Sequence, residues 1–260
     1  MKTITAHMIC KNEERWIWYS LMSIINHVDR ILVYDTGSND NTVEIIKTIK
    51  SEKIELVQFE NIDAKKFTEL RNMQLKQTKT DWIFVCDADE IWDYNSLKLV
   101  IERIQNAPDN VIATFVHYFE FVKDIWHYYM GHEQIIFPLN EKKTYGWYAL
   151  RFMKNMKGLV CGNDYGLEGY FTENGNELQR NGFCNYIWGD DIYYFHTRNL
   201  IRSSCIENDE KVMLRVEKAH HHKVNLIPEV YRGIKVVYPE VFSLQRPSIV
   251  PDIYNLYPKD

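Results

Sequence analysis

Three carboxylates follow a short apolar run in the first third of the chain. The run from Trp82 to Cys86 leads directly into Asp87, Ala88, Asp89 and Glu90. A run of this length is typical of a strand buried on both faces, and open α/β sheets bind ligands at the carboxyl ends of such strands. Carboxylates buried there need a positive partner, because leaving them unpaired is costly. The sequence therefore predicts a hard divalent cation at this position, which could in turn hold a diphosphate.

The Asp87-Ala88-Asp89 spacing has a simpler alternative. An Asp-x-Asp pattern is expected about once by chance in a chain of this length. On the motif alone, a solvated acidic turn that caps the next helix explains these residues as well as a metal site does. The buried strand in front of the motif is what favours the metal site.

Composition limits the classes of protein to consider. The chain has 260 residues, enough for one large α/β domain or two small ones, and 45% of them are hydrophobic. A net charge of −5 argues against a general nucleic-acid binder. The cysteines are scattered, odd in number and form no Cys-x-x-Cys pair, which favours buried thiols in a reducing compartment. They are Cys10, Cys86, Cys161, Cys184 and Cys205.

No segment approaches the roughly 18 consecutive apolar residues of a transmembrane helix. The first residues also lack the apolar region of a signal peptide. We therefore expect a cytoplasmic protein. Contact with the inner face of the membrane stays open, although no basic amphipathic helix demands it.

The first half of the chain alternates between strand and helix patterns. Asn12 is expected to cap the first helix, and Asn41 with Glu44 to form a capping box for the second. The third helix is expected to turn Phe67, Leu70 and Met73 inward. The expected strands are 4–9, 31–34, 54–59 and 82–86, and the expected helices begin after residue 12 and cover 43–49 and 67–77.

Strand–helix alternation of this kind predicts a mostly parallel sheet, whose strand ends meet at one edge. Residues 9–12, 35–42 and 87–90 should lie along that edge. Asp35 is there, and although such a residue is more often a turn residue, it could accept hydrogen bonds from a base or ribose. The chain contains neither a dinucleotide-binding glycine motif nor a P-loop, so metal and basic side chains would have to neutralise a phosphate.

Four segments of the first 95 residues resemble family 2 glycosyltransferases of the GT-A fold. They occur in the family's order and at similar spacing. The resemblance implies a Rossmann-like, three-layer α/β/α fold with a mostly parallel central sheet. The segments are Met8–Glu14, Tyr34–Thr42, Arg71–Asn72 and Asp81–Glu90.

The resemblance also implies a reaction, the transfer of a sugar from a nucleotide-sugar donor, with a UDP-sugar as the expected case. Asp35 would hold the base or ribose, and Asp89 would bind Mn²⁺ or Mg²⁺ bridging the diphosphate. Asp87 would serve mainly the ribose. The metal would stabilise the charge that grows on the leaving nucleoside diphosphate. Further donor contacts are expected from Lys11, Asn12, Glu13, Arg71, Ala88 and Arg198, with an ion-pair role as the alternative for Lys11 and Arg71.

In the second half, Arg151–Asn155 resembles a family segment that precedes a glycine and an acidic residue. Here Asn163 and Asp164 stand where many relatives have His-Glu. An inverting enzyme of this type needs a carboxylate to take the proton of the acceptor hydroxyl. Asp164 is the expected base, and the alternatives are Glu168, Asp190 and Asp191.

The segment Tyr193–Asn199 resembles a late strand whose histidine completes the metal site in many relatives. His196 is therefore expected as a second metal ligand, and Arg198 as a diphosphate contact. The expected organisation is a donor-binding half over 1–110, an acceptor-binding half over 111–205, and a C-terminal helix with a proline-rich extended tail over 206–260.

Three functions are consistent with these patterns. The first is a metal-dependent, inverting glycosyltransferase with a carbohydrate or glycolipid acceptor, of the kind used in surface-polysaccharide assembly. A nucleotidyltransferase shares the nucleotide-binding core but usually carries a glycine-rich basic loop, where this chain has Cys10 to Glu13. The third is a relative that binds a nucleotide sugar without turnover, which the Asn163-Asp164 departure favours.

Overall fold

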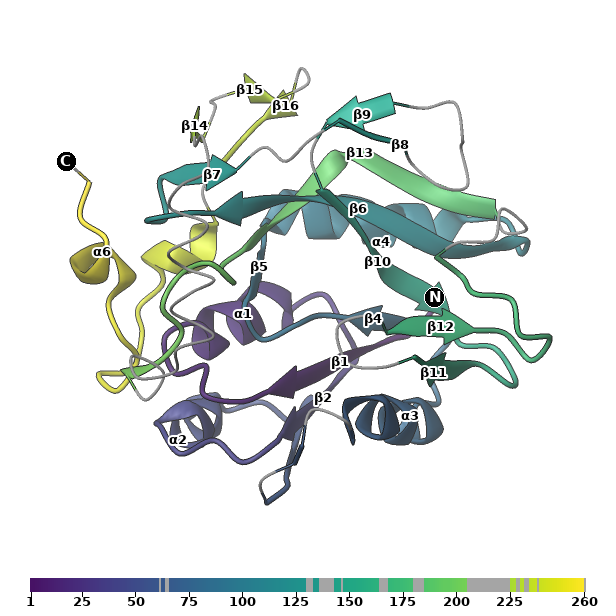
Figure 1. Cartoon of the computed structure of the whole chain (residues 1–260), viewed down its shortest axis with the longest axis horizontal. Helices are drawn as coiled ribbons and strands as arrows, with labels where there is room; N and C mark the ends of the chain where they lie inside the picture. Colours follow the sequence, from purple (N-terminus) through teal and green to yellow (C-terminus); the bar gives the residue numbers. More distant parts are fainter. Residues whose placement is uncertain are drawn as a thin grey trace.

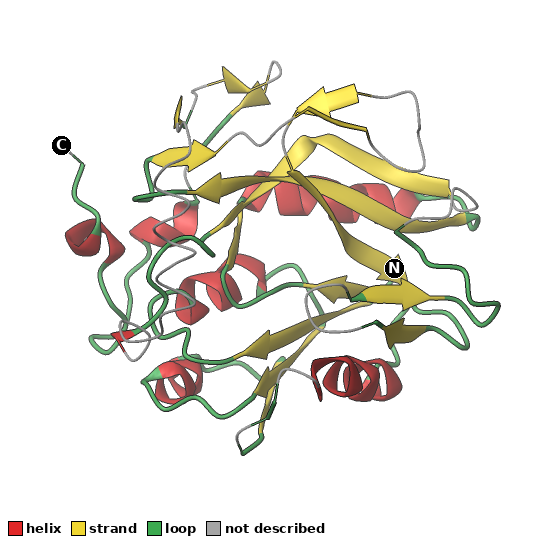
Figure 2. Cartoon of the chain, viewed as in Figure 1, coloured by secondary structure: helices red, strands yellow, loops and turns green. Residues whose placement is uncertain are grey.

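A large curled sheet with helices on both faces forms the centre of the molecule (Figures 1 and 2). The computed structural model describes residues 1–60, 62–63, 66–129, 133–135, 143–145, 147–163, 168–179, 185–204, 225–227, 230–231, 234–237 and 239–259. The expected alternation of strands and helices is present in the first half. The α/β fold class is confirmed.

The described elements are strands, five helices and one 3₁₀ turn. The strands are β1 Ile4–Cys10, β2 Arg30–Asp35, β3 Ile54–Gln58, β4 Trp82–Val85, β5 Glu90–Trp92, β6 Val111–Phe121, β7 His127–Tyr129, β8 Glu133–Ile135, β9 Lys143–Tyr145, β10 Trp147–Lys154, β11 Val160–Gly162, β12 Gly169–Phe171, β13 Asn185–His196, β14 Asn225–Leu226, β15 Val230–Tyr231 and β16 Ile234–Lys235. The helices are α1 Ile17–Ile24, α2 Thr42–Thr48, α3 Phe67–Gln77, α4 Tyr94–Asn106, α6 Ile253–Leu256 and the 3₁₀ turn η3 Glu240–Ser243.

The main sheet runs in the order β14-β7-β6-β10-β4-β1-β2-β3, and β13 adds to β6 and β5. The four strands at the β3 end of this path are parallel to their neighbours. β10 is antiparallel to both β4 and β6, which makes β6 parallel to β4. β13 is parallel to β6, so β1, β2, β3, β4, β6 and β13 point the same way, whereas β5, β7 and β10 run in the opposite direction.

Successive side chains of β4 point to opposite faces of the sheet, as in any strand. Trp82 and Phe84 lie in the larger hydrophobic core with side chains of α1, α2 and α4. Ile83 and Val85 lie in a second core with β11, β12 and Leu75 of α3. A strand buried on both faces is what the continuous apolar run predicted.

Three local expectations were wrong. Asn12 does not cap α1, because the helix begins after Trp16, whose side chain makes no capping bond. Asn41 makes no capping bond either, and instead Asp40 Oδ1 accepts the amide of Thr42 at 2.9 Å. Met73 is 39% exposed.

The buried face of α3 is partly polar. The Gln74 side chain is fully buried and donates to the carbonyls of Met8 and Leu32 at 2.9 and 3.0 Å. Arg71 donates to the carbonyl of His7 at 3.2 Å. Hydrogen bonds to strand carbonyls thus replace the apolar contact that was expected from Met73.

The end of the chain packs against the domain. Tyr19 of α1 donates its hydroxyl to the carbonyl of Pro251 at 2.8 Å. The indole nitrogen of Trp126 donates to the carbonyl of Tyr257 at 3.1 Å, and the Tyr257 ring stacks on Trp16. Residues 239–259, which include η3 and α6, therefore pack along the domain, while residues 205–224 lie outside the described part.

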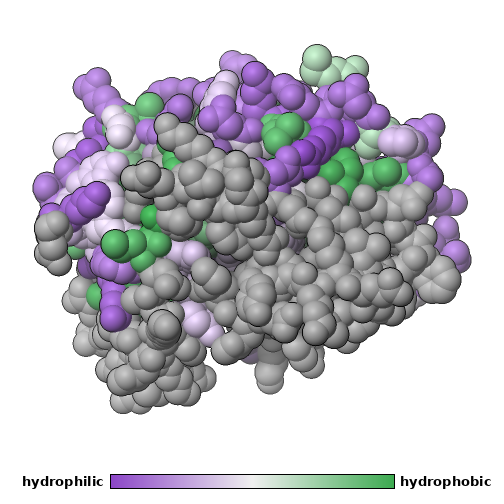
Figure 3. All heavy atoms as spheres, turned by 90° about the horizontal axis from the view of Figure 1, so that it is seen from above, coloured by the Kyte–Doolittle hydropathy of each residue, from purple (hydrophilic) through white to green (hydrophobic). Residues whose placement is uncertain are grey.

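Within the described ranges, no helix has the length and apolar character needed to cross a membrane. Seen from above in Figure 3, the coloured surface is mostly hydrophilic and its hydrophobic patches are small and separate.

Candidate functional site

The direction of the strands collects the expected site residues at one edge of the sheet. β1 and β2 end together, with Cys10 opposite Asp35. The turn 87–90 follows β4, which is parallel to β1. β13 runs in the same sense and ends at His196, opposite Glu120 near the end of β6. Residues from four distant parts of the sequence thus meet at the carboxyl edge (Figure 1).

Asp87 is held by two arginines. Its Oδ1 accepts from Arg71 at 2.7 Å, and its Oδ2 lies 3.5 Å from a terminal nitrogen of Arg151. Arg71 has a side chain only 4% exposed and also bonds to the backbone of β1. Of its two expected roles, donor contact or structural ion pair, the structure displays the ion pair.

Glu90 is fully buried and forms an ion pair with Arg151 of β10. The Nε of Arg151 also donates to the hydroxyl of Tyr194 at 3.0 Å. Burial raises the pKa of Glu90, and the Arg151 guanidinium opposes that rise. The sequence singled out Arg151 by resemblance but assigned it no partner. Its place beside both Asp87 and Glu90 makes it the central cation of the acidic turn.

Asp89 pairs with His196. The distance from Asp89 Oδ1 to His196 Nε2 is 3.3 Å, and both side chains are nearly buried. The Asp89 carbonyl accepts from the amide and hydroxyl of Thr197 at 2.9 and 3.1 Å. Burial lowers the pKa of His196, but the neighbouring Asp89 carboxylate outweighs it and leaves the pKa above its ordinary value.

This pair suits a divalent ion. Two ligands about 2.1 Å from an octahedral ion and at right angles to each other lie about 3.0 Å apart, close to the observed separation. The Nδ1 of His196 is buried and has no hydrogen-bond partner among the described residues, so the contact of Nε2 with Asp89 is the polar contact of the ring there. No group of three or more His, Cys, Asp or Glu side chains in the described residues could hold an ion. Mg²⁺ and Mn²⁺ often take only one or two protein ligands beside phosphates and water.

Asp35 lies at the end of β2 and organises the loop that follows. It is 2% exposed and accepts hydrogen bonds from the amides of Gly37 and Ser38 at 3.2 and 3.1 Å, and from the Ser38 hydroxyl. Asn12 links this loop to β1: its Oδ1 accepts the amide of Asn39 at 2.9 Å, and its own amide donates to Ser38 at 2.8 Å. Asn12 has a φ of 54°, a left-handed conformation that asparagine tolerates.

Glu13 and Lys11 have opposite environments. Glu13 is buried, and its Oε1 lies 2.5 Å from Arg202. Burial raises the pKa of Glu13 to about 8, although Arg202 acts against the rise. Lys11 is exposed. The sequence did not identify Arg202, whose pairing ties the segment after His196 to the loop after β1.

Arg198 lies two residues beyond His196 and donates its Nε to Glu120 of β6. Its side chain is 38% exposed, whereas that of Glu120 is 3% exposed. Glu120 was not among the residues predicted from the sequence. A pattern that indicates it is present, because Glu120 is the single carboxylate within the apolar run of residues 111–122.

The candidate bases have different outcomes. Asp164 lies outside the described residues, as does the side chain of Asp190. Glu168 is half-buried just before β12. Asp191 forms an ion pair with Arg103 of α4, with 2.7 Å between Oδ1 and Nη1. That pairing makes Asp191 the least suitable of the four as a proton acceptor. Ala88 is buried in the turn between the two aspartates.

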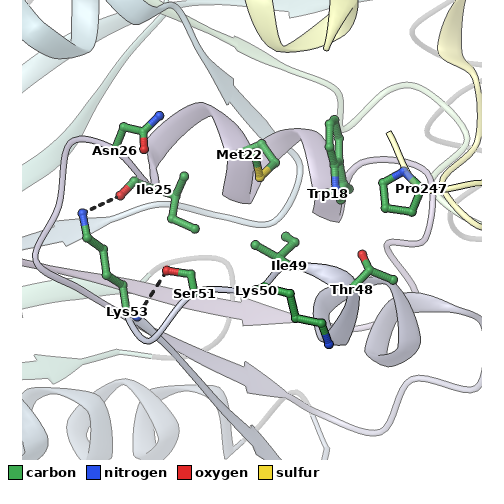
Figure 4. A pocket seen from close by; sticks show the side chains of 10 residues that line it. All are labelled: Trp18, Met22, Ile25, Asn26, Thr48, Ile49, Lys50, Ser51, Lys53 and Pro247. Atoms are coloured by element: carbon green, nitrogen blue, oxygen red, sulfur yellow. Dashed lines mark hydrogen bonds between the residues drawn. The ribbon is translucent and has the colours of Figure 1, made fainter. Parts of the chain in front are cut away.

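A cavity in the described structure lies away from this edge. It has a volume of about 440 Å³ and lies between α1 and the turn from α2 to β3, with Trp18, Met22 and Ile49 on its apolar side and Pro247 at its edge (Figure 4). Lys53 bonds to the carbonyl of Ile25 there. None of its lining residues belongs to the carboxyl edge, so it is not part of the candidate site.

Comparison with known families identifies the family to which this edge belongs. The family described as Glycosyl transferase family 2 matches residues 5–162, which include β1, the Asp35 loop and the acidic turn. The chain belongs to glycosyl transferase family 2. The family expected from the four sequence segments is thus confirmed, and the match also takes in β10 with Arg151.

Curated relatives in this family match only part of the chain. An uncharacterized glycosyltransferase of Rickettsia typhi is 34% identical over 90 residues, 35% of this chain and 29% of the relative. The SPbeta prophage-derived glycosyltransferase SunS of Bacillus subtilis is 32% identical over 91 residues, 35% of this chain and 21% of SunS. The chain therefore aligns with less than a third of the length of these relatives.

A solved structure supports the fold of the family. S. aureus TarS 1-349 in complex with UDP matches with a TM-score of 0.51 and 16% identity, covering 85% of this chain and 67% of TarS. At this identity the similarity concerns the fold alone. Together with the family match it confirms the GT-A type of α/β fold.

Proposed function

We propose that the protein is a metal-dependent glycosyltransferase that moves a sugar from a nucleotide-sugar donor to a carbohydrate or glycolipid acceptor. One observation carries the proposal: the Asp89–His196 pair lies at the same sheet edge as the Asp35 loop, in a member of glycosyl transferase family 2. In this proposal, residues 1–110 form the donor-binding half, residues 111–205 the acceptor-binding half, and residues 206–260 a C-terminal extension.

The donor would lie across the carboxyl ends of β1, β2 and β4, with its nucleoside at the Asp35 loop. Asp35 and Ser38 offer a carboxylate and a hydroxyl whose present bonds are to each other and to the loop. A uracil or ribose could compete for these groups. Lys11 and Asn12 flank the same loop, and the exposed Lys11 is free to approach a phosphate. A UDP-sugar is the donor that we expect.

Asp89 and His196 would hold Mn²⁺ or Mg²⁺. When bound, such an ion supplies positive charge to the diphosphate as the bond to the sugar breaks. Arg198 adds a second positive group beside this pair. Asp87 would stay between its two arginines and fix the turn that presents Asp89. Its contact with the ribose and the donor contact of Arg71 stay predictions.

The acceptor would enter from the side of the second half. Its hydroxyl oxygen attacks the anomeric carbon, the bond from that carbon to the diphosphate breaks, and a carboxylate takes the hydroxyl proton. Attack opposite the leaving group inverts the configuration at the anomeric carbon. We retain Asp164 as the base, and Glu168 is the next candidate because its carboxylate makes no ion pair in the described structure.

The first experiment measures nucleoside diphosphate release from a panel of nucleotide sugars with Mn²⁺, Mg²⁺ or EDTA. We expect release with a metal, none with EDTA, and loss of at least 100-fold in Asp89→Asn. Asp109→Asn is the matched control, because the Asp109 side chain is fully exposed and lies 3.9 Å from Lys154, away from the edge. Release that survives in Asp89→Asn would contradict the metal assignment.

Further arms of the same experiment separate the alternatives. Pyrophosphate formed from a nucleoside triphosphate and a sugar phosphate would identify a nucleotidyltransferase instead. Donor binding without release or transfer, with many acceptors offered, would identify a binding protein. Asp164→Asn should remove most transfer and keep donor affinity, and normal transfer by this variant would shift the base to Glu168.

A further inference from the structure

A buried carboxylate beside the metal pair has no role in the mechanism so far. Glu120 is 2% exposed and is the single carboxylate of β6. It lies directly opposite His196 in the parallel pairing of β6 with β13. Burying a carboxylate in an apolar strand costs free energy unless a cation pairs with it, and Arg198 is that cation here.

The way in which Glu120 binds Arg198 leaves part of the guanidinium available. Its hydrogen bond is to Nε, the nitrogen nearest the stem. No described residue accepts a hydrogen bond from the two terminal nitrogens of Arg198. The side chain is 38% exposed, so part of it is open to solvent. An arginine held at Nε presents its remaining donors in a fixed fork, the geometry that suits a phosphate.

The fork lies close to the Asp89–His196 pair. Arg198 follows His196 by two residues, and the intervening Thr197 bonds twice to the Asp89 carbonyl. An anion bound at the Asp89–His196 pair would be within the reach of this arginine.

We propose that Glu120 is a positioning residue of the donor site: it holds Arg198 by Nε and thereby directs the terminal nitrogens at the donor diphosphate. This inference rests on the proposed function, because it needs a nucleoside diphosphate at this edge. Glu120 itself does not act as the base, since its carboxylate is enclosed and already paired. A purely structural ion pair is the competing explanation, and it predicts an effect on stability but none on phosphate affinity.

The test compares UDP with uridine, which lacks the diphosphate, by calorimetric titration of the full chain with Mn²⁺ present. Glu120→Gln should weaken UDP binding about fivefold to tenfold and leave uridine binding unchanged. Arg198→Ala should weaken UDP binding at least tenfold, and the double variant should be no weaker than Arg198→Ala. Glu55→Gln is the control, because Glu55 also pairs with an arginine, Arg30, but lies on β3.

Each outcome has a distinct meaning. UDP affinity that is unchanged in Glu120→Gln, or uridine affinity that falls as much as UDP affinity, overturns the inference and leaves the proposed function standing. Failure of the unchanged protein to bind UDP overturns both. Should Glu120→Gln not fold, Arg198→Ala at the exposed end of the pair still decides, since equal UDP affinity in that variant refutes a diphosphate contact.

Discussion

Arg151 and Glu90 offer the sharpest test of how the acidic turn is held. The Arg151 side chain is 12% exposed, and it contacts Glu90, which is fully buried, as well as Asp87 and the Tyr194 hydroxyl. Arg151→Met keeps most of the stem but leaves Glu90 without its cation. Loss of one partner from a buried pair costs about 3–5 kcal/mol, and we expect a free energy of unfolding lower by that amount.

The reverse change should cost less. Glu90→Gln leaves Arg151 with Asp87 at 3.5 Å and with the Tyr194 hydroxyl at 3.0 Å, so the guanidinium keeps two partners. We expect a loss of about 1–3 kcal/mol, the range for a buried group that loses one hydrogen bond. In the double variant neither buried charge remains, and its loss should be smaller than the sum of the single losses by about 2 kcal/mol.

The assay is urea unfolding of the four proteins of this cycle, followed by circular dichroism and tryptophan fluorescence. A control cycle uses Lys98 and Glu102, an exposed pair at 4.0 Å on α4, where we expect a coupling of about 0.5 kcal/mol or less. Additive losses for Arg151 and Glu90, within about 0.5 kcal/mol, would refute the view that they form one buried unit.

Three other predictions concern stability. Burial and the nearby Arg71 hold the pKa of His7 well below its ordinary value, so at acidic pH the unfolded chain binds a proton there and the folded chain does not. The free energy of unfolding should therefore fall by about 1.4 kcal/mol from pH 7.5 to 5.5, and urea unfolding of His7→Gln should lack this part of the loss. Asp93 caps α4 by accepting the amide of Ser96 at 2.7 Å; Asp93→Ala should lower the unfolding free energy by about 1 kcal/mol, and Asp93→Ser by much less. Asn12 has a positive φ, a conformation that costs alanine more than glycine. Thermal unfolding should therefore find Asn12→Ala less stable than Asn12→Gly by about 1 kcal/mol, and equal stabilities would show that this position is not strained.

The arrangement of the strands could be predicted because it depends on local patterns. The continuous run at Trp82 predicts burial on both faces, and β4 contributes alternate residues to two cores. Strand–helix alternation then requires parallel pairing, which brings Asp35 and the acidic turn to one edge whatever the details of packing. His196 was expected at this edge only from the family resemblance. Its position depends on β10, which lies between β4 and β6 and is antiparallel to both.

Helix starts were the least predictable features. Asn12 and Asn41 both have the residue type of a cap, but the backbone places Asn12 in a left-handed turn and gives the capping role at α2 to Asp40. Several polar residues in a row can each satisfy the same amides. Which one does so is decided by the tertiary contacts of the loop, such as the bond from Asn41 to Glu14 at 3.0 Å, and not by the residue type.

The ion pairs of the site could not be read from spacing at all. Glu90 and Arg151 are 61 positions apart, and Glu120 and Arg198 are 78 apart. Each pair forms because the strands that carry its residues, or that lie next to them in the chain, are neighbours in the sheet. A sequence pattern can indicate that a buried carboxylate needs a cation, as Glu120 does in its apolar run, but it does not say which arginine supplies it.

These pairings predict that the carboxylates of the acidic turn and of β6 differ in function. Asp87, Glu90 and Glu120 each have an arginine, a group that keeps its charge and its fork-shaped contact at any ordinary pH. Asp89 is paired instead with His196, whose ring can lose its proton and use the same nitrogen to bind a metal. An ion would have to displace an arginine from Asp87, Glu90 or Glu120, but only a proton from the pair of Asp89 and His196. The electrostatics of the site therefore favour Asp89 as the metal ligand on grounds separate from the family resemblance.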